Sequence, residues 1–134
     1  MDLLSLIPEN FQEIPYVAQI NVKRKSMESF NGELLKLVQQ ANGRAGVVPI
    51  KNRDYTLIYN TVAHMLEDKN MLVFVEAIKS VELLAILIGP LNYLKASKVK
   101  IWIGLLAGKY SETKTPVITA VDKAMLAIVS NAYN

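Results

Sequence analysis

A helix–turn–helix pattern repeats along the length of this chain and limits the folds that it can adopt. Short polar turns are expected near residues 20–23, 68–70 and 111–115, so the turns recur at a spacing of about 40–47 residues. Such a period is typical of stacked helix pairs, in which each pair covers the apolar face of the next. We therefore predict an all-α fold, an α-solenoid of about three antiparallel helix pairs.

All 134 residues are expected to form a single domain, with repeats at approximately 1–45, 46–90 and 91–134. The second helix of each repeat gives the clearest signal, because apolar residues recur at three- and four-residue spacing. These helices are predicted at 22–42, 71–88 and 115–132. Their apolar faces consist of Met27, Phe30, Leu34, Leu37 and Val38, then Val73, Ala77, Val81, Leu84 and Ile88, then Val117, Val121, Ala124 and Ile128.

Helix-terminal signals support these boundaries. Gly89-Pro90 is expected to stop the second of these helices, and Gly43 the first. Thr115 is the expected N-cap of the third helix, because Pro116 would then occupy the first helical position, where its missing N–H is not needed.

The first helix of each repeat is less regular. Residues 55–67 are predicted to form a helix with a broad apolar stripe, and Asn52 or Asp54 can cap its N-terminus. Residues 93–110 contain β-branched residues around Trp102 that also fit a strand, and the repeat context favours a helix with Trp102 in the core.

The N-terminus and one loop complete the predicted topology. Pro8-Glu9 can open a short helix through Phe11, which Pro15 should kink or end within about two turns. Residues 43–51 contain Gly46 and Pro49 and are expected to form the loop between the first two repeats.

No arrangement of residues predicts catalysis or a cofactor. The chain has no cysteine, which excludes disulfides and cysteine-ligated zinc, and its one histidine, His64, cannot supply a ligand cluster. The stretch Gly43-Arg44-Ala45-Gly46 lacks the spacing and the Lys-Ser/Thr of a phosphate-binding loop. We therefore expect a protein that is not an enzyme and binds no metal or cofactor.

The net charge of +3 and the pI near 9.1 predict only a mild attraction to acidic partners, too weak to indicate nucleic acid. The longest apolar run, 81–94, is interrupted by Glu82, Pro90 and Asn92 and is too short to span a bilayer. Residues 1–8 do not resemble a signal peptide, because Asp2 replaces the positive residues. We expect a soluble intracellular protein without a membrane partner.

The lysines of the predicted turns recur at equivalent positions. In stacked helix pairs all turns of one kind emerge on the same edge, so Lys23, Lys69 and Lys114 should line one ridge. Helix N-termini at the same edge add partial positive charge and free N–H groups. The pattern therefore favours binding to an acidic protein surface. The alternative for the Lys23-Arg24-Lys25 run is an ordinary solvated face.

Three stretches resemble the TOG domain, a domain of HEAT repeats that binds tubulin in microtubule polymerases, and most closely a second-position TOG domain. The opening 2–11 resembles the family's start, with an acidic residue, an apolar pair, Pro and Phe. Glu67-Asp68-Lys69-Asn70 and the following apolar positions resemble its second-repeat turn and helix. Glu112-Thr113-Lys114-Thr115-Pro116-Val117 resembles its lysine-rich third turn.

This resemblance implies that the turns form a tubulin-binding edge, with the first turns facing β-tubulin, and that the protein contributes to regulating microtubule dynamics in the cytoplasm at the cytoskeleton. Other cytoskeletal or centrosomal proteins are further expected partners. The implied tubulin-binding residues are Ile20, Asn21, Lys23, Asp68, Lys69, Asn70, Thr113, Lys114 and Thr115.

Two differences from the family matter. Ile20 stands where the family's first turn carries tryptophan, although Lys23 keeps the basic position. A TOG domain also has about twice as many helix pairs. The last helix is therefore expected to expose apolar residues, with Met125, Ile128 and Val129 as candidates, and to allow self-association. The alternative function is a HEAT-like adaptor that binds another protein and not tubulin.

Overall fold

The computed structural model describes residues 1–42, 48–88 and 96–131, and within these ranges it contains helices and no strand. This result confirms the predicted all-α class. The helices are α1 (Ile20–Gln40), α2 (Thr56–Leu66), α3 (Met71–Ile88), α4 (Ala96–Lys109) and α5 (Thr115–Asn131), preceded by the 3-10 helices η1 (Leu3–Leu6) and η2 (Phe11–Tyr16).

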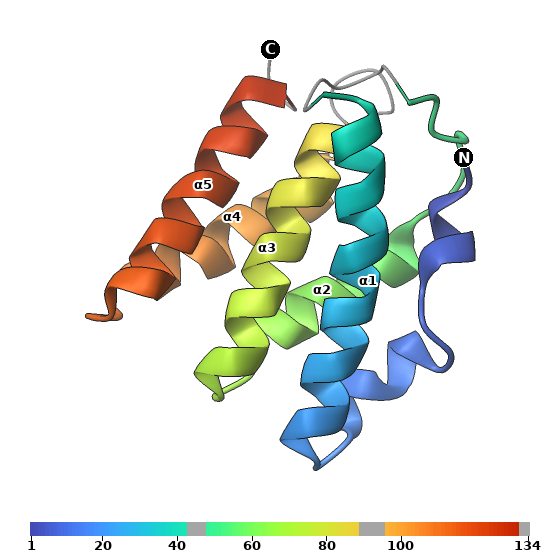
Figure 1. The fold of residues 1–134 in the computed structure, drawn as a ribbon. Coiled ribbons are helices and arrows are strands. Elements are labelled where there is room, and N and C mark those ends of the chain that lie inside the picture. The colour runs from blue at the N-terminus through green and yellow to red at the C-terminus, as the bar shows by residue number, and fades with distance from the viewer. Residues whose placement is uncertain (43–47, 89–95, 132–134) are drawn as a thin grey trace.

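The helices form two layers (Figure 1). In the first layer α1, α3 and α5 lie side by side and run in the same direction, with α3 in the middle. Behind them lie α2 and α4, which contact each other, and η2 contacts α2. Each of α2 and α4 leads through a short connection into the first-layer helix that follows it. The connections into α1, α3 and α5 are at the same edge of the layer.

The central position of α3 explains its composition. Its bounds agree with the prediction at both ends, and every residue of its predicted apolar face is buried. Ser80, Leu83 and Ala85 are buried as well, because α3 packs on α1, α2 and α5 at once. A helix that is apolar around most of its circumference is one enclosed by neighbours. The predicted apolar faces of α1 and α5 are buried too, except for Val38, which is half-buried.

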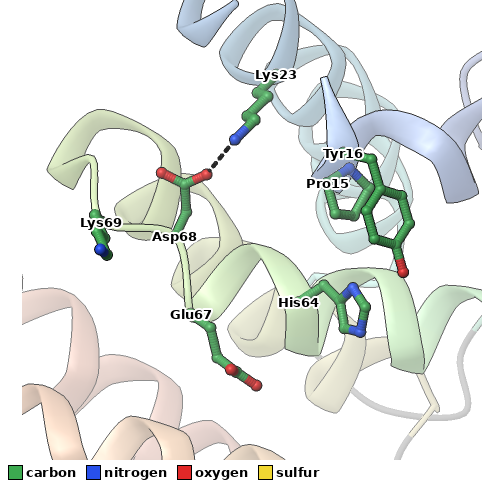
Figure 2. Close-up of a pocket in the computed structure, with 7 residues that line it drawn as sticks. All are labelled: Pro15, Tyr16, Lys23, His64, Glu67, Asp68 and Lys69. Carbon is green, nitrogen blue, oxygen red and sulfur yellow. Dashed lines mark hydrogen bonds and ion pairs between the residues drawn. The ribbon is translucent and has the colours of Figure 1, made fainter. Parts of the chain in front are cut away.

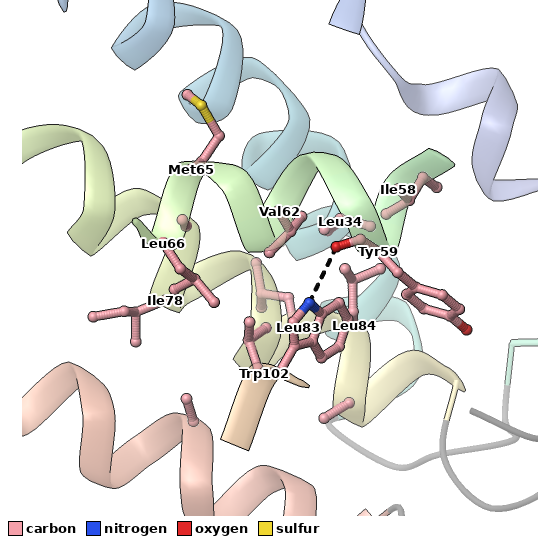
Figure 3. Close-up of a cluster of buried hydrophobic side chains, with 14 of the residues drawn as sticks. Leu34, Ile58, Tyr59, Val62, Met65, Leu66, Ile78, Leu83, Leu84 and Trp102 are labelled. Atoms are coloured by element: carbon pink, nitrogen blue, oxygen red, sulfur yellow. Dashed lines mark hydrogen bonds between the residues drawn. The ribbon is translucent and has the colours of Figure 1, made fainter. Parts of the chain in front are cut away.

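Trp102 is a core residue, as predicted, and it lies on a helix and not on a strand. Only 1% of its surface is exposed, and its indole Nε1–H donates a hydrogen bond of 3.3 Å to the carbonyl oxygen of Tyr59 (Figure 3). The Tyr59 ring meets the indole edge to face at a centroid distance of 5.3 Å. Burial also raises the pKa of the Tyr59 hydroxyl to about 12. This contact joins α4 to α2.

The N-terminal prediction was wrong. No helix begins at Pro8; instead η2 begins at Phe11, after Asn10 in a left-handed conformation with φ of 56°, and it includes Pro15 near its end. Proline has no N–H to donate, so this segment cannot extend into an α-helix. Phe11 is nevertheless fully buried and packs on Phe30 of α1 at a centroid distance of 5.0 Å. The first predicted repeat thus contains one α-helix, preceded by 3-10 turns.

Several predicted boundaries fall outside the described residues. These are the stops at Gly43 and Gly89-Pro90, the repeat boundaries near 45 and 90, and the ends of two predicted helices at 93 and 132. The loop prediction 43–51 is only partly covered, by residues 48–51, which are not helical.

A polar contact inside the first layer was not predicted. Asn31 of α1 is 3% exposed, and its amide nitrogen donates to both the backbone carbonyl and the carboxylate of Glu76 on α3, at 2.9 Å each. The hydroxyl of Ser80, fully buried, donates to the Asn31 amide oxygen. A buried polar group is stable only when it is hydrogen-bonded, so these three residues fix the register of α1 against α3.

Candidate functional site

The connections that lead into α1, α3 and α5 lie at one edge of the molecule, and we refer to this edge as the turn edge (Figure 1). Residues 67–70 connect α2 to α3, and residues 110–114 connect α4 to α5. Asp68, Lys69 and Asn70 therefore lie in a turn, as predicted. The turn edge carries the N-termini of three parallel helices, whose dipoles all direct positive potential toward it.

The predicted first turn was misplaced. Helix α1 begins at Ile20, so Ile20, Asn21 and Lys23 belong to its first turn of helix, and the connection is formed by residues 17–19. Gln19 is the N-cap and makes no side-chain capping bond. The sequence contains no Ser, Thr, Asp or Asn at 18 or 19 to mark this start, which is why periodicity alone set the boundary too late.

The start of α5 differs from the prediction by one residue. Thr115 is the first helical residue, and the carbonyl of Lys114 accepts the first helical bonds, from the N–H groups of Val117 and Ile118 at 3.1 and 3.3 Å. Lys114 is therefore the N-cap. Pro116 lies at the second position, where its N–H would also lack a helical partner. Thr113, Lys114 and Thr115 are all exposed at the turn edge.

Lys23, in the first turn of α1, forms an ion pair with Asp68, in the connection between α2 and α3. The Lys23 ammonium lies 2.7 Å from the Asp68 carboxylate, and the side chains are only 14% and 12% exposed (Figure 2). The expectation that Lys23 offers a free positive charge to a partner is therefore wrong. Its charge is neutralised within the molecule, where it ties α1 to the α2–α3 turn.

Asp68 and Asn70 also build the turn in which they lie. The second oxygen of Asp68 accepts the N–H of Asn70 at 2.8 Å, and the Asn70 side chain accepts the N–H of Leu72 at 2.9 Å, which caps α3. Burial alone would raise the pKa of Asp68, but the hydrogen bonds from Lys23 and Asn70 and the charges of Lys23 and Lys109 outweigh it, and the pKa is lowered. The carboxylate is thus committed to structure.

Among the predicted lysines, Lys69 and Lys114 remain available. Both are exposed, and no ion pair engages either of them within the described part of the chain. Between them along the chain, Lys109 is half-buried with its ammonium 4.0 Å from the centroid of the Phe74 ring. Exposed Glu67 and Glu112 lie on the same connections, so the turn edge is of mixed charge and not a continuous basic ridge.

A shallow hollow of about 400 Å³ opens beside the Lys23–Asp68 pair (Figure 2). Tyr16 and His64 form one wall, with their rings edge to face at a centroid distance of 5.6 Å. The remaining lining residues are Pro15, Lys23, Glu67, Asp68 and Lys69. The hollow therefore combines charged groups with an aromatic wall at the turn edge.

Tyr16 also lies at this edge, although no sequence pattern pointed to it. It is 76% exposed, more than any other large apolar or aromatic side chain described, and it precedes the connection into α1. Ile20, at the position of the family's tryptophan, is 42% exposed. Tyrosine side chains exposed on a rigid surface are frequent anchors of protein interfaces.

The chemistry available at this edge is recognition of charged and aromatic groups. Residues 1–42, 48–88 and 96–131 contain no group of three or more His, Asp or Glu side chains that could hold a metal ion. Across the same residues, no helix is both long and apolar enough to cross a membrane.

The outer side of α5 differs in part from its prediction. Val129 is 59% exposed, as expected, and Met125 is half-buried, but Ile128 is only 1% exposed and belongs to the core. Leu126, which was not predicted, is 66% exposed. The three- and four-residue spacing could not decide which flank of α5 meets a neighbour.

A comparison of the chain with protein families, curated proteins and solved structures finds no match.

Proposed function

We propose that this chain is a non-enzymatic binding module whose helices stack as HEAT-like repeats and whose turn edge binds tubulin. The observation that carries the proposal is the common edge at which α1, α3 and α5 begin, with Lys69 and Lys114 exposed on two separate connections. Helix N-termini and lysines attract carboxylates, so this edge suits an acidic partner surface, and the resemblance to TOG domains implies that the partner is tubulin.

The arrangement of layers supports the stacking part of this proposal. In HEAT-like repeats the second helices form one layer and the first helices the other. Here α1, α3 and α5 would be the second helices, α2 and α4 the first helices of the later repeats, and η2 a reduced first helix of the first repeat.

The contributions of the edge residues differ in this proposal. Lys69 and Lys114 would supply positive charge, Thr113 and Thr115 hydrogen bonds, and Ile20 with Tyr16 apolar contact area. Lys23 and Asp68 would act indirectly, by joining α1 to the α2–α3 connection, and Asn70 by stabilising that connection.

The alternative is an adaptor that binds another protein and not tubulin. It is favoured by the pairing of Lys23 with Asp68 and by Ile20, because both remove groups that a tubulin-binding edge of the TOG kind would use. Size-exclusion chromatography with unpolymerised tubulin separates the two functions. We expect a shift of the chain into the tubulin fraction that disappears at high salt, since exposed charges are screened. Separate elution at high concentrations of both proteins in low salt would favour the adaptor.

A further inference from the structure

Between α3 and α5 lies a groove on the face of the first layer that α2 and α4 do not cover. It consists of two adjoining hollows of about 410 and 420 Å³ that share Glu82 and Lys123 at their junction. No residue of α2 or α4 lines either hollow. Since α5 has 17 residues, the groove extends over roughly 25 Å of helix.

Apolar and polar side chains both line the groove. One end is lined by Val75, Pro116 and Ala120 together with Lys79, Thr115 and Thr119, and the other by Ile86, Leu126 and Ala127 together with Ser130 and Asn131. Leu126 is 66% exposed and stands beside the groove as a protruding apolar side chain. An interface that covers charged groups is stable only if each of them meets an opposite charge.

The charges that line the groove are Glu82 and Lys79 on α3 and Lys123 on α5, and only Glu82 and Lys123 line both hollows. Neither forms an ion pair with any residue of the described part of the chain. Glu82 and Lys123 thus stand on opposite walls of the groove where the two hollows meet, so a second copy can offer each of them an opposite charge.

We infer that this groove is the interface of a homodimer in which α3 of each copy packs over α5 of the other. A two-fold axis along the groove places Glu82 opposite the partner's Lys123 and Ile86 opposite the partner's Leu126. An axis across the groove would instead place Glu82 over Glu82, which like charges disfavour. The dimer therefore buries four parallel helices, two from each copy, and leaves the turn edge of both copies accessible.

The size of the groove sets the expected affinity of the dimer. Two helices per copy provide a surface at the small end of specific interfaces, so the dimer should form at micromolar to millimolar protein concentrations. Sedimentation equilibrium or light scattering over that range should give a mass that rises with concentration from one chain toward two.

Charge reversal tests the pairing itself. Glu82→Lys and Lys123→Glu should each weaken the dimer by about tenfold or more, because each places like charges opposite one another at two symmetric positions. The double variant Glu82→Lys with Lys123→Glu exchanges the two charges and should restore association. Lys100→Glu, an exposed reversal on α4, is the matched control and should leave the dimer unchanged.

Circular dichroism of each variant separates loss of the dimer from loss of the fold. A chain that stays monomeric at millimolar concentration overturns the inference, and so does a dimer that Glu82→Lys does not weaken or that the double variant does not recover. A dimer lost on Val129→Lys and not on Leu126→Ala would assign association to the outer flank of α5 instead.

Discussion

The ammonium of Lys23 and the carboxylate of Asp68, 45 residues apart in the sequence, lie 2.7 Å from each other. One comes from the first turn of α1 and the other from the α2–α3 connection, and both side chains are largely buried. The pair fixes the position of α1 relative to the α2–α3 connection, and because its two charges cancel, it adds no net charge to the turn edge.

Breaking the Lys23–Asp68 pair should lower the free energy of unfolding. Asp68→Asn leaves the Lys23 ammonium without its partner in a partly buried site, with an expected loss of about 1–2 kcal/mol, between the values for exposed and fully buried pairs. Urea unfolding followed by circular dichroism measures it. Glu28→Gln, which removes the exposed partner of Arg24, should cost less than about 0.5 kcal/mol. Equal losses in the two variants would show that burial of the Lys23 pair adds nothing.

The same pair predicts how stability depends on pH. The pKa of Asp68 is lower in the folded chain than its ordinary value of 3.8, so the folded state favours the ionised carboxylate. This stabilisation is fully present above the unfolded-state pKa and is lost as the pH falls through the folded-state pKa. The stability difference between wild type and Asp68→Asn should therefore be constant near neutrality and shrink below about pH 4. A difference that persists unchanged at acid pH would contradict the assignment.

Reversal of the exposed edge lysines should weaken tubulin binding. Lys69→Glu and Lys114→Glu should each cost on the order of 0.5–1 kcal/mol, mainly through slower association, and the combined variant should lose most of the binding. Stopped-flow association with tubulin at two salt concentrations gives the rates. Lys36→Glu and Lys100→Glu, which lie on helices away from the edge, are the controls. An equal response of edge and control variants would indicate attraction by net charge alone.

Restoring a tryptophan at the first turn of α1 should tighten binding. Ile20 is 42% exposed, and Ile20→Trp adds aromatic contact area and an indole N–H without entering the core. We expect a several-fold lower Kd for tubulin and an unchanged unfolding midpoint. Val22→Trp is the matched control, because Val22 lies in the same turn and is 41% exposed. If the two substitutions improve binding equally, the gain comes from general hydrophobicity and not from the position of Ile20.

The single tryptophan should report on the core between α2 and α4. Trp102 is 1% exposed, so its native emission should be blue-shifted and should move to the red on unfolding. Trp102→Phe loses the hydrogen bond to Tyr59 and some volume, at about 1–2 kcal/mol, and Trp102→Ala should cost about 3–5 kcal/mol. Calorimetry measures both. A native emission maximum like that of free tryptophan would contradict the buried position.

Neighbouring residues of α5 should respond in opposite ways to the same substitution. Val129 is 59% exposed, and Val129→Lys should change stability by less than about 0.5 kcal/mol. Ile128 is 1% exposed, and Ile128→Lys should unfold the chain, because a buried charge without a partner is strongly unfavourable. Thermal unfolding of the two variants is the measurement. Loss of the fold in Val129→Lys would place that side chain in the core.

The positions of the helices could be predicted from local patterns, because each depends on residues close in sequence. The three- and four-residue spacing of apolar residues gave α3 at both ends, and α2 and the start of α5 to within one residue. The buried position of Trp102 followed from its place on an apolar stripe. The pattern did less well at the N-terminus, where two prolines limit helix formation and no capping residue marks the start of α1.

Local patterns were enough to predict that this chain is helical, which side of each helix is apolar, and that lysines recur at the turns. Which of those lysines is free depends on the packing of the helices, because Lys23 meets its carboxylate through a contact between distant segments. Packing also decides between the two predictions for Ile128, which lies in the core, and it brings Asn31 to Glu76 and places Glu82 and Lys123 on one groove. Helical spacing fixes a residue's direction around its own axis, whereas its neighbours depend on how the helices pack, which no local pattern encodes.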